Sequence, residues 1–443
     1  MRKYSHDTSV RVRLPHRPGQ LARFADTVAR AGGLLGDITT HQLGEAWTVR
    51  DVVLETEDAA HTERVVAALR ALEGVEVLAV SDQVFARHQG GKVHCGSRVK
   101  VDQVTDLRYI YTPGVARVSL ALQAEPEKAW ELTSIGRSVG IFTNGTRVLG
   151  LGNIGALASL PVMEGKAVLY DRFAGLSAVP LLVDTLDPGR FIDTVELLAR
   201  SFGGIHLEDI RIPDCFTIED ELVRRLQRPV MHDDQHGTAT VALAAIRNAC
   251  WLTGLDPRVC RVGQLGLGAA GSAIARLCLA WGAREVLVSD VNPQAVARMV
   301  ALGAVASDLG TITKTCDIVV ATTGKPGLLS PAMVGRGQVL FALSNPDPEI
   351  APDAALAAGA AFAGDGRSIN NALAFPGIFK GALAVRARAI TPRMLLAAAD
   401  AIARLADPGE VVPSPFHPDV HTNVARAVAD AATAEGLAGT ARA

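Results

Sequence analysis

Residues 261–290 read RVGQLGLGAAGSAIARLCLAWGAREVLVSD, and this stretch decides the fold class of the chain. Arg261–Leu265 predicts a short strand, GLGAAG (266–271) a tight turn, and Ser272–Trp281 a helix that ends at a glycine. Glu285–Ser289 then predicts a second strand. A strand, a glycine-rich turn, a helix and a further strand are typical of a doubly wound α/β domain with a parallel sheet.

The glycine turn also predicts a dinucleotide site. Its pattern lets the backbone approach a pyrophosphate, whose charge is favoured by the free N–H groups at the start of the helix. We expect Asp290 to accept hydrogen bonds from ribose hydroxyls and to repel a 2′-phosphate. Residues 291–294 hold no Lys or Arg, so the pattern favours NAD, and NADP stays open if a basic residue arrives from elsewhere in the fold. The expected cofactor-binding residues in this stretch are Gly266, Gly268, Ala269, Ala270, Gly271 and Asp290.

A second glycine pattern, GLGNIG, occupies residues 150–155. Pro161 and Gly165 follow it and argue against a continuous helix after the turn. We therefore interpret residues 150–155 as a close-packed turn near the substrate and place the dinucleotide at residues 266–271.

Composition excludes several classes of protein. The 443 residues carry 44 Lys+Arg and 46 Asp+Glu, so no nucleic-acid partner is expected. No apolar run approaches the length of a membrane span, and residues 1–7 lack the apolar core of a signal peptide. The six cysteines are scattered, which favours a reducing cytoplasm over a disulfide framework.

The pattern of elements divides the chain into three expected domains. Residues 1–88 predict strands and helices in the order βαββαβ, followed by a linker at 89–92. Residues 89–240 predict an α/β substrate and metal domain, on which the helical residues 380–443 would pack. Residues 241–379 form the predicted Rossmann-type dinucleotide domain.

Three carboxylates suggest a divalent cation. Glu208 and Asp209 follow a predicted strand at 204–207, and Asp234 lies further along the chain. Oxygen ligands of this kind suit Mg²⁺ or Mn²⁺. Because adjacent strand residues point to opposite faces, the chain would have to bend after the strand. The alternative is a set of solvated acids, with Asp233 or Asp234 capping a helix that starts near Ala239.

Two further side chains are candidates for acid–base chemistry. Tyr111 lies immediately before a Pro-Gly turn, and Lys166 enters the apolar run 167–170. Loss of solvation would lower the pKa of Lys166 and make it a candidate base. The alternatives are a tyrosine that bonds the backbone and a lysine that reaches water.

Taken together, the motifs of this chain resemble those of malic enzymes of the bacterial type. They span about 290 residues and follow one another in the same order as in that family. The matching segments are YTPGVA (111–116), RVLGLGNIG (147–155), PVMEGK (161–166), LED (207–209), HDDQHGTA (232–239), SNP (344–346) and NN (370–371). Asn144 stands where many relatives are expected to carry Asp, so its role is left open.

The resemblance implies a role for each matching position. It implies that Tyr111 and Lys166 are the acid–base pair and that Glu208, Asp209 and Asp234 hold Mg²⁺ or Mn²⁺. It implies that Arg147, Asn345 and Asn371 contact the substrate, with Asn345 also near the cofactor. The implied reaction is the oxidative decarboxylation of L-malate with NAD or NADP. Lys166 takes the C2 hydroxyl proton, hydride leaves C2 for the nicotinamide, the C4 carboxylate leaves as CO₂, and Tyr111 protonates C3 to give pyruvate.

Residues 8–84 resemble ACT domains, through RPGQL (17–21) and the following AGG (31–33). The resemblance implies a regulatory unit that binds an amino acid or another metabolite, and a dimerisation module without ligand is the alternative. We expect a homodimer or a higher homo-oligomer, because an unpaired edge strand is a liability.

Other activities stay open at this point. An amino-acid dehydrogenase would need no divalent cation, and a non-catalytic amino-acid sensor would need no intact acid–base set. A related enzyme acting on another 2-hydroxy diacid, such as tartrate, is a further alternative.

Overall fold

The computed structural model describes residues 4, 6–256, 258–367 and 369–439. These fall into two compact units, residues 1–94 and residues 95–443. Residues 1–3 of the predicted first domain and residues 440–443 of the predicted substrate and metal domain lie outside the described residues. Among the helices that are described, none has both the length and the apolar character needed to cross a membrane.

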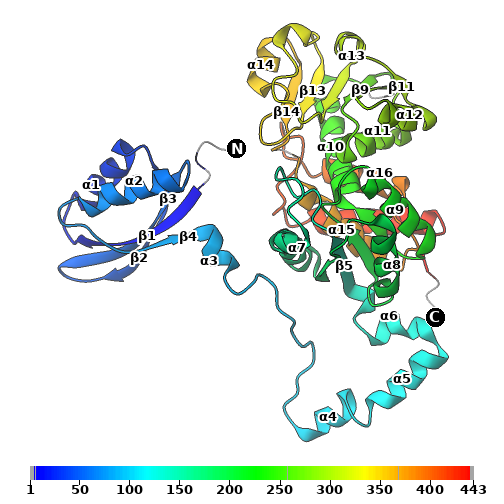
Figure 1. Cartoon of the computed structure of the whole chain (residues 1–443), viewed down its shortest axis with the longest axis horizontal. Helices are drawn as coiled ribbons and strands as arrows, with labels where there is room; N and C mark the ends of the chain where they lie inside the picture. Colours follow the sequence, from blue (N-terminus) through cyan, green and yellow to red (C-terminus); the bar gives the residue numbers. More distant parts are fainter. Residues whose placement is uncertain (1–3, 5, 257, 368, 440–443) are drawn as a thin grey trace. The chain divides into compact units, whose positions relative to one another are not determined.

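The first unit is a four-stranded antiparallel sheet in the order β2-β3-β1-β4, with α1 and α2 on one face (Figure 1). Alternate residues of β1 are buried, and Val10 and Val12 pack against Phe24 of α1 and Val65 of α2. The βαββαβ order expected from the sequence is confirmed. The bounds are β1 His6–Pro15, α1 Gln20–Arg30, β2 Leu34–Leu43, β3 Trp47–Thr56, α2 Ala59–Arg70 and β4 Glu76–Asp82.

The second unit contains two parallel sheets. The first has the order β6-β5-β7-β8, and β5 is buried along its whole length, as expected for a strand covered on both faces. Its strands are β5 Ser138–Thr143, β6 Ser177–Leu182, β7 Gly204–Leu207 and β8 Val230–His232. The helices between and after them are α7 Ala156–Leu169, α8 Pro188–Ala199, α9 Asp214–Arg225 and α10 Asp233–Thr253.

The other parallel sheet has six strands in the order β11-β10-β9-β12-β13-β14. This is the doubly wound arrangement expected from residues 261–290. Its strands are β9 Arg261–Leu265, β10 Glu285–Ser289, β11 Val305–Ala306, β12 Ile318–Ala321, β13 Val339–Ala342 and β14 Phe362–Asp365. Its helices are α11 Ala269–Trp281, α12 Pro293–Ala301, α13 Leu309–Thr315 and α14 Pro352–Ala357.

Three C-terminal helices, α15 Phe375–Ala384, α16 Pro392–Ala403 and α17 Val420–Ala434, complete the main core. α15 and α16 both pack on α17, and α16 also packs on α10 and α11. One cluster of buried side chains joins these helices to both parallel sheets. The six-stranded sheet, which we call the dinucleotide sheet, and the four-stranded parallel sheet therefore share one core, and packing fixes their relative position.

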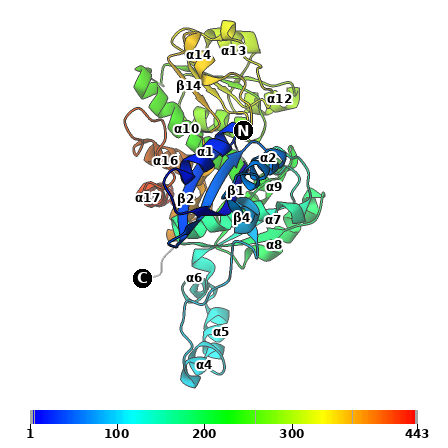
Figure 2. The same cartoon turned by 90° about the vertical axis from the view of Figure 1, so that its left-hand side faces the viewer.

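A helical hairpin in residues 104–124 stands away from the two parallel sheets in both views (Figures 1 and 2). It consists of α4 Val104–Ile110 and α5 Val115–Ala124, neither of which has a buried residue. α4 packs on α5, and α5 packs on the short η1 helix Pro126–Lys128. We call residues 104–124 the arm.

Two helices differ from expectation. α7 continues through Pro161, although proline was expected to interrupt it. The carbonyl that Pro161 cannot bond belongs to Leu157, a residue 78% exposed, so we infer that water can satisfy it. α10 begins at Asp233, not near Ala239, because Gly237 leaves room for the Asp233 carboxylate within the first turn.

Packing of α15 on α17 gives a test of this core. A Cβ on Gly381 would meet the backbone oxygen of Ala425 and lie 2.9 Å from Cβ of Val428. We expect Gly381→Ala to lower the free energy of unfolding by about 1–3 kcal/mol, measured by urea unfolding. Gly335→Ala is the control, since its nearest neighbour would be 3.4 Å away. Equal stability of the two variants would contradict the packing described.

Candidate active site and metal centre

The ends of β7 and β8 bring the acidic side chains together. The two strands are parallel neighbours, with Leu207 paired to His232. Glu208 and Asp209 follow β7, and Asp233 and Asp234 follow β8 in the first turn of α10. Because parallel strands end at the same edge of a sheet, residues distant in sequence meet there.

The chain bends at Asp209, just after β7, as it must if Glu208 and Asp209 are to reach one ion. The φ of Asp209 is 55°, a left-handed conformation that few residues other than glycine adopt. The carboxylates of Glu208 and Asp209 therefore reach a common point, although they are adjacent after a strand. One ligand oxygen each from Glu208, Asp209 and Asp234 lie within 4.8 Å of one another.

The chemistry of this group fits a hard divalent cation. Oδ2 of Asp209 is buried and has no hydrogen-bond partner among the described residues, which is costly for a carboxylate oxygen. Asp234 is held by a hydrogen bond of 3.1 Å from the backbone N–H of Asp209 to its Oδ2. Three carboxylates at one point are the ligand type that Mg²⁺ and Mn²⁺ prefer.

The pKa values of Glu208 and Asp209 also support a cation at this cluster. Burial raises the pKa of Glu208 to about 8, although the neighbouring Lys166 ammonium opposes the rise. Burial also raises the pKa of Asp209 to about 8, reinforced by the charges of Glu208 and Asp234. The protein alone therefore compensates these negative charges poorly, and a bound cation would supply the missing positive charge.

Lys166 lies in the same cluster. Its Nζ is 2.5 Å from Oδ2 of Asp233 and 3.1 Å from Oε1 of Glu208, and 4.8 Å from the centre of the Phe375 ring. Burial acts to lower the pKa of Lys166, but the charges of Asp233 and Glu208 outweigh it and raise the pKa above its usual value. The expected lowering is therefore wrong, because the neighbours in space are carboxylates and not the apolar run that follows Lys166 in sequence.

The alternative interpretation required the side chain of Asp233 or Asp234 to cap α10. Neither side chain does so. The residue before the helix is His232, and both acids lie inside the first turn. Asp233 is fully buried, and burial raises its pKa to about 6 even though it pairs with Lys166. Its position beside the lysine makes it a site residue that the sequence did not single out.

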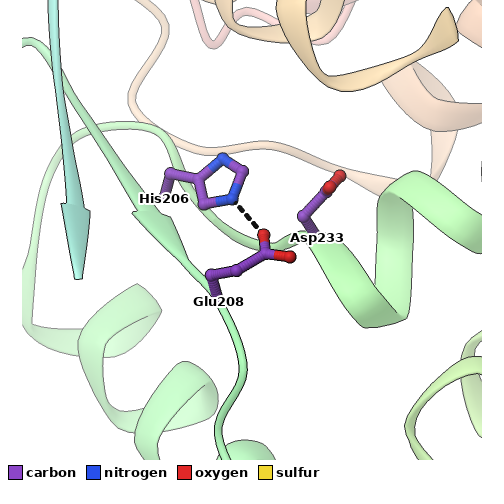
Figure 3. Close-up of side chains that lie close together, drawn as sticks. All are labelled: His206, Glu208 and Asp233. Atoms are coloured by element: carbon purple, nitrogen blue, oxygen red, sulfur yellow. Dashed lines mark hydrogen bonds and ion pairs between the residues drawn. The ribbon is translucent and has the colours of Figure 1, made fainter. Parts of the chain in front are cut away.

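Sequence reasoning also missed Tyr170 and His206. The imidazole of His206 lies against the Glu208 carboxylate (Figure 3), with Nε2 at 2.5 Å from Oε2. The Tyr170 hydroxyl is 2.8 Å from Nδ1 of the same ring. A signal existed, since residues two apart on a strand share a face and His206 precedes Glu208 by two.

Two further histidines of this region, His232 and His236, take part in fixing the start of α10. Glu219 on α9 accepts hydrogen bonds from the backbone of His232 at 2.7 Å and from the side chains of Gln235 and His236 at 2.8 and 3.0 Å. These bonds fix the start of α10 relative to α9. No group of metal-ligand type among the described residues includes His232 or His236.

The glycine turn at 266–271 joins β9 to α11, as expected. Gly266 has a φ of 86°, and a Cβ on Gly271 would collide with the backbone oxygen of Gly266. Asp290 holds the turn: Oδ2 accepts from the backbone of Leu267 at 2.5 Å, and Oδ1 accepts from Asn292 at 2.7 Å.

Most of the other predicted residues line a cleft of about 460 Å³ beside this turn. The predicted members of its wall are Arg147, Gly268, Ala269, Ala270, Gly271, Asn345 and Asn371. Gly266 and Asp290 line an adjoining cleft of about 390 Å³, and both clefts include Arg147, Gly268, Thr322 and Gly324. The predicted cofactor-binding and substrate-contacting residues therefore meet in space.

The cleft is tied to the acidic cluster in two ways. The backbone N–H of Arg147 donates to the backbone oxygen of Asp209 at 3.0 Å. Thr238 of α10 lines the cleft and lies one helical turn after Asp234. The cleft and the acidic cluster are therefore neighbours along two short stretches of chain.

Tyr111 is the exception. It ends α4 on the arm and is 69% exposed, so the structure does not bring it to Lys166. The Asn144 side chain is used locally: its Oδ1 accepts from the Thr146 hydroxyl at 2.6 Å, and its amide donates to the backbone oxygen of Thr185 at 3.2 Å. Asn144 therefore shapes the loop that precedes Arg147.

The fold and the site together define a class: an α/β protein with a dinucleotide-type sheet and, beside a lysine, a cluster of carboxylates of the kind that can hold a cation. Comparison with known proteins gives the family. The model of the malic enzyme N-terminal domain matches residues 92–189, and that of the malic enzyme NAD binding domain matches residues 365–435.

Whole-chain similarity extends much further. The chain is 49% identical to NAD-dependent malic enzyme 1 of Bacillus subtilis, over 95% of this chain and 96% of that protein. It is 39% identical to the NADP-dependent malic enzyme of Halomonas elongata, over 75% of this chain and 88% of that protein. The crystal structure of malic enzyme from Pyrococcus horikoshii matches with a TM-score of 0.75 and 39% identity, over 79% of this chain and 88% of that one. The chain belongs to the malic enzyme family.

The carboxylate cluster predicts a measurable cation affinity. We expect Asp234→Ala to weaken Mn²⁺ binding at least about 10-fold, as followed by calorimetry, because it removes one of three oxygen ligands. Asp193→Ala is the control, since Asp193 pairs with Arg225 at the surface, with a side chain 69% exposed. Unchanged Mn²⁺ affinity in Asp234→Ala would refute the site.

Proposed function

We propose that this chain catalyses the oxidative decarboxylation of L-malate to pyruvate and CO₂, with reduction of NAD or NADP and with a divalent cation. The observation that carries the proposal is the meeting of Lys166 with the Glu208, Asp209 and Asp234 carboxylates at one sheet edge, beside the cleft of the glycine turn. Relatives that cover nearly the whole chain carry the name NAD-dependent malic enzyme, which supports the same reaction.

Three residues would hold the cation: Glu208, Asp209 and Asp234. A divalent cation at this point supplies Lewis acidity, which acidifies a hydroxyl and polarises a carbonyl. The residues that would hold the dinucleotide lie around the glycine turn, and the pyrophosphate would lie at the start of α11, which no described side chain caps. Asp290, at the end of β10 beside the glycine turn, favours NAD over NADP because its carboxylate would repel a 2′-phosphate. Similar proteins include one named NAD-dependent and one named NADP-dependent malic enzyme.

Substrate carboxylates need positive charge and amide donors. Arg147, Asn345 and Asn371 line the same cleft, and a guanidinium can bind a carboxylate with two hydrogen bonds. Arg147 is also tied through its backbone to Asp209. We assign these three residues to orienting malate with its C2 hydroxyl toward Lys166 and the acidic cluster.

Lys166 is the proposed base for the C2 hydroxyl proton. Its raised pKa arises from the charges of Asp233 and Glu208, and that effect weakens when positive charge neutralises Glu208. Asp233, 2.5 Å from Nζ, keeps the amine directed into the cluster. A positioned base of this kind contributes about 10²–10⁴-fold to the rate.

The proposed acid, Tyr111, requires a second copy of the chain. It lies on the arm, whose apolar side chains are exposed, including Val104 at 78% and Leu120 at 64%. Tyr170 is the other phenol close to the cluster, but it is buried and bonded to His206. We infer a homodimer in which the arm of one protomer covers its apolar face against the partner and brings Tyr111 to the partner's Lys166.

The three domains are assigned roles on the same basis. Residues 89–240 with 380–443 would form the substrate and metal domain, and residues 241–379 the dinucleotide domain. Residues 1–88 would form an ACT-like regulatory or dimerisation domain. The turn after β1 borders a hollow of about 320 Å³ that includes His16, Arg17 and Arg50, which suits a small anionic effector.

The reaction itself is tested by mixing the protein with L-malate and Mn²⁺ and recording the absorbance of reduced nicotinamide, with NAD and NADP in parallel. We expect malate-dependent reduction, faster with NAD, that EDTA abolishes. Reduction that survives EDTA would indicate a metal-independent dehydrogenase. No reduction with malate or tartrate would favour a sensor.

The composite site is tested by complementation. We expect Tyr111→Phe and Lys166→Ala each to lose nearly all turnover, and their mixture after subunit exchange to regain about a quarter of wild-type activity, since half of the dimers then contain one intact site. A mixture of wild type with the double variant is the control for exchange. Failure to recover activity, with exchange shown by labelled subunits, would place Tyr111 and Lys166 in one protomer or remove Tyr111 from the reaction.

A further inference from the structure

Three buried side chains form a continuous hydrogen-bonded series behind the acidic cluster. The Tyr170 hydroxyl lies 2.8 Å from Nδ1 of His206, and Nε2 of His206 lies 2.5 Å from Oε2 of Glu208. Tyr170 and His206 are completely buried, and Glu208 is 3% exposed. None of these three groups can exchange its partner for water without movement of the core.

The series has a defined direction. A cation ligand is an ionised carboxylate, whose oxygens only accept hydrogen bonds, so with Glu208 in that form Nε2 of His206 carries the hydrogen that it donates to Oε2. Nδ1 of the neutral ring is then an acceptor, and the Tyr170 hydroxyl donates to it. The phenol therefore selects the tautomer of His206 that can bind Glu208.

Aromatic side chains fix the ring in this orientation. His206 stacks on Phe379, with ring centres 5.9 Å apart and planes at 26°, and meets the edge of Phe375 at 5.5 Å. Tyr170 packs edge-on against the same two phenylalanines, at 4.8 Å and 5.7 Å. Rotation of the imidazole away from Glu208 would displace this packing.

The two oxygens of Glu208 consequently have different tasks. Oε2 is occupied by His206, while Oε1 faces Lys166 at 3.1 Å (Figure 3 shows the His206 side). His206, Glu208 and Asp233 are also close enough to form a cation group of their own. That use is disfavoured, because Nε2 is committed to Oε2 and the Lys166 ammonium lies between the two carboxylates.

We propose that Tyr170 and His206 are positioning residues that hold Glu208 with Oε1 directed to the divalent cation. The inference rests on the proposed assignment of Glu208 as a cation ligand. It adds two residues that would touch neither substrate nor cation and would act only through the Glu208 carboxylate. Groups that orient a metal ligand in this way commonly set metal affinity.

The test is Mn²⁺ affinity, measured by calorimetry on the full-length protein without substrate. We expect His206→Leu to weaken Mn²⁺ binding by about 10–100-fold, because Glu208 loses its donor. His206→Gln, whose amide can still donate, should recover most of the affinity. Tyr170→Phe removes only one hydroxyl and should weaken binding in the wild-type background but cause no further loss in His206→Leu.

Phe191→Leu is the matched control, since Phe191 is a fully buried phenylalanine that belongs to a different core cluster and is not one of the rings packed on His206. It should lower thermal stability and leave Mn²⁺ affinity unchanged. Binding of NADH, followed by fluorescence, confirms that each variant is folded. Wild-type Mn²⁺ affinity in His206→Leu, or an equal loss in Phe191→Leu, would overturn the proposal.

Two variants separate this inference from the proposed function. If Glu208→Gln and Asp234→Ala both bind Mn²⁺ like the wild type, the cation site itself is wrong. If they lose Mn²⁺ while His206→Leu and Tyr170→Phe retain it, the site stands and the positioning role of Tyr170 and His206 is refuted.

Discussion

The parallel pairing of β7 with β8 is the constraint on which the site depends. It sets Leu207 opposite His232, and the residues that follow each strand then meet. Four carboxylates and one ammonium consequently share a small, largely buried volume. Burying so many charges is unfavourable unless they are paired. The cluster is tolerated because Lys166 and His206 satisfy some of the oxygens, and a cation would satisfy those that remain.

Buried side chains around the cluster fix the two chain segments that carry its acids. Glu219 accepts three hydrogen bonds at the start of α10, which fixes the turn that carries Asp233 and Asp234. Desolvation acts to raise the pKa of Glu219, but the combined interactions with His236 and His232 outweigh it and hold the pKa below its usual value. Tyr170 and His206 provide a similar support behind Glu208. Both acidic segments are therefore held in place by hydrogen bonds with buried side chains of the core.

Local patterns predicted the parts of the fold that local physics controls. Residues 261–290 gave the correct order of strand, turn, helix and strand, because periodicity and the glycine spacing act over a few residues. Glu208 and Asp209 became candidates because they follow a predicted strand, whereas Asp234 was joined to them as a cation ligand by the resemblance to malic enzymes. Properties set by neighbours distant in sequence were not predicted: Lys166 lies against Asp233, 67 positions away, and that contact reverses the expected shift of its pKa. Tyr111 could not be placed for the same reason, since its surroundings in the proposed dimer belong to another chain.

Helix α10 has a consequence for how this architecture can change. Its 21 residues begin with two acids of the cluster, and its packing reaches α11 and β13 of the dinucleotide sheet. At 1.5 Å per residue it spans about 31 Å, so one rigid element sets the separation between the cation end and the strand β9 that follows. Adding or removing a single residue would rotate the acids by about 100° relative to the buried face. An insertion or deletion inside α10 would therefore separate the acids from the rest of the cluster, whereas a change of length in a loop outside the site would leave the cluster intact.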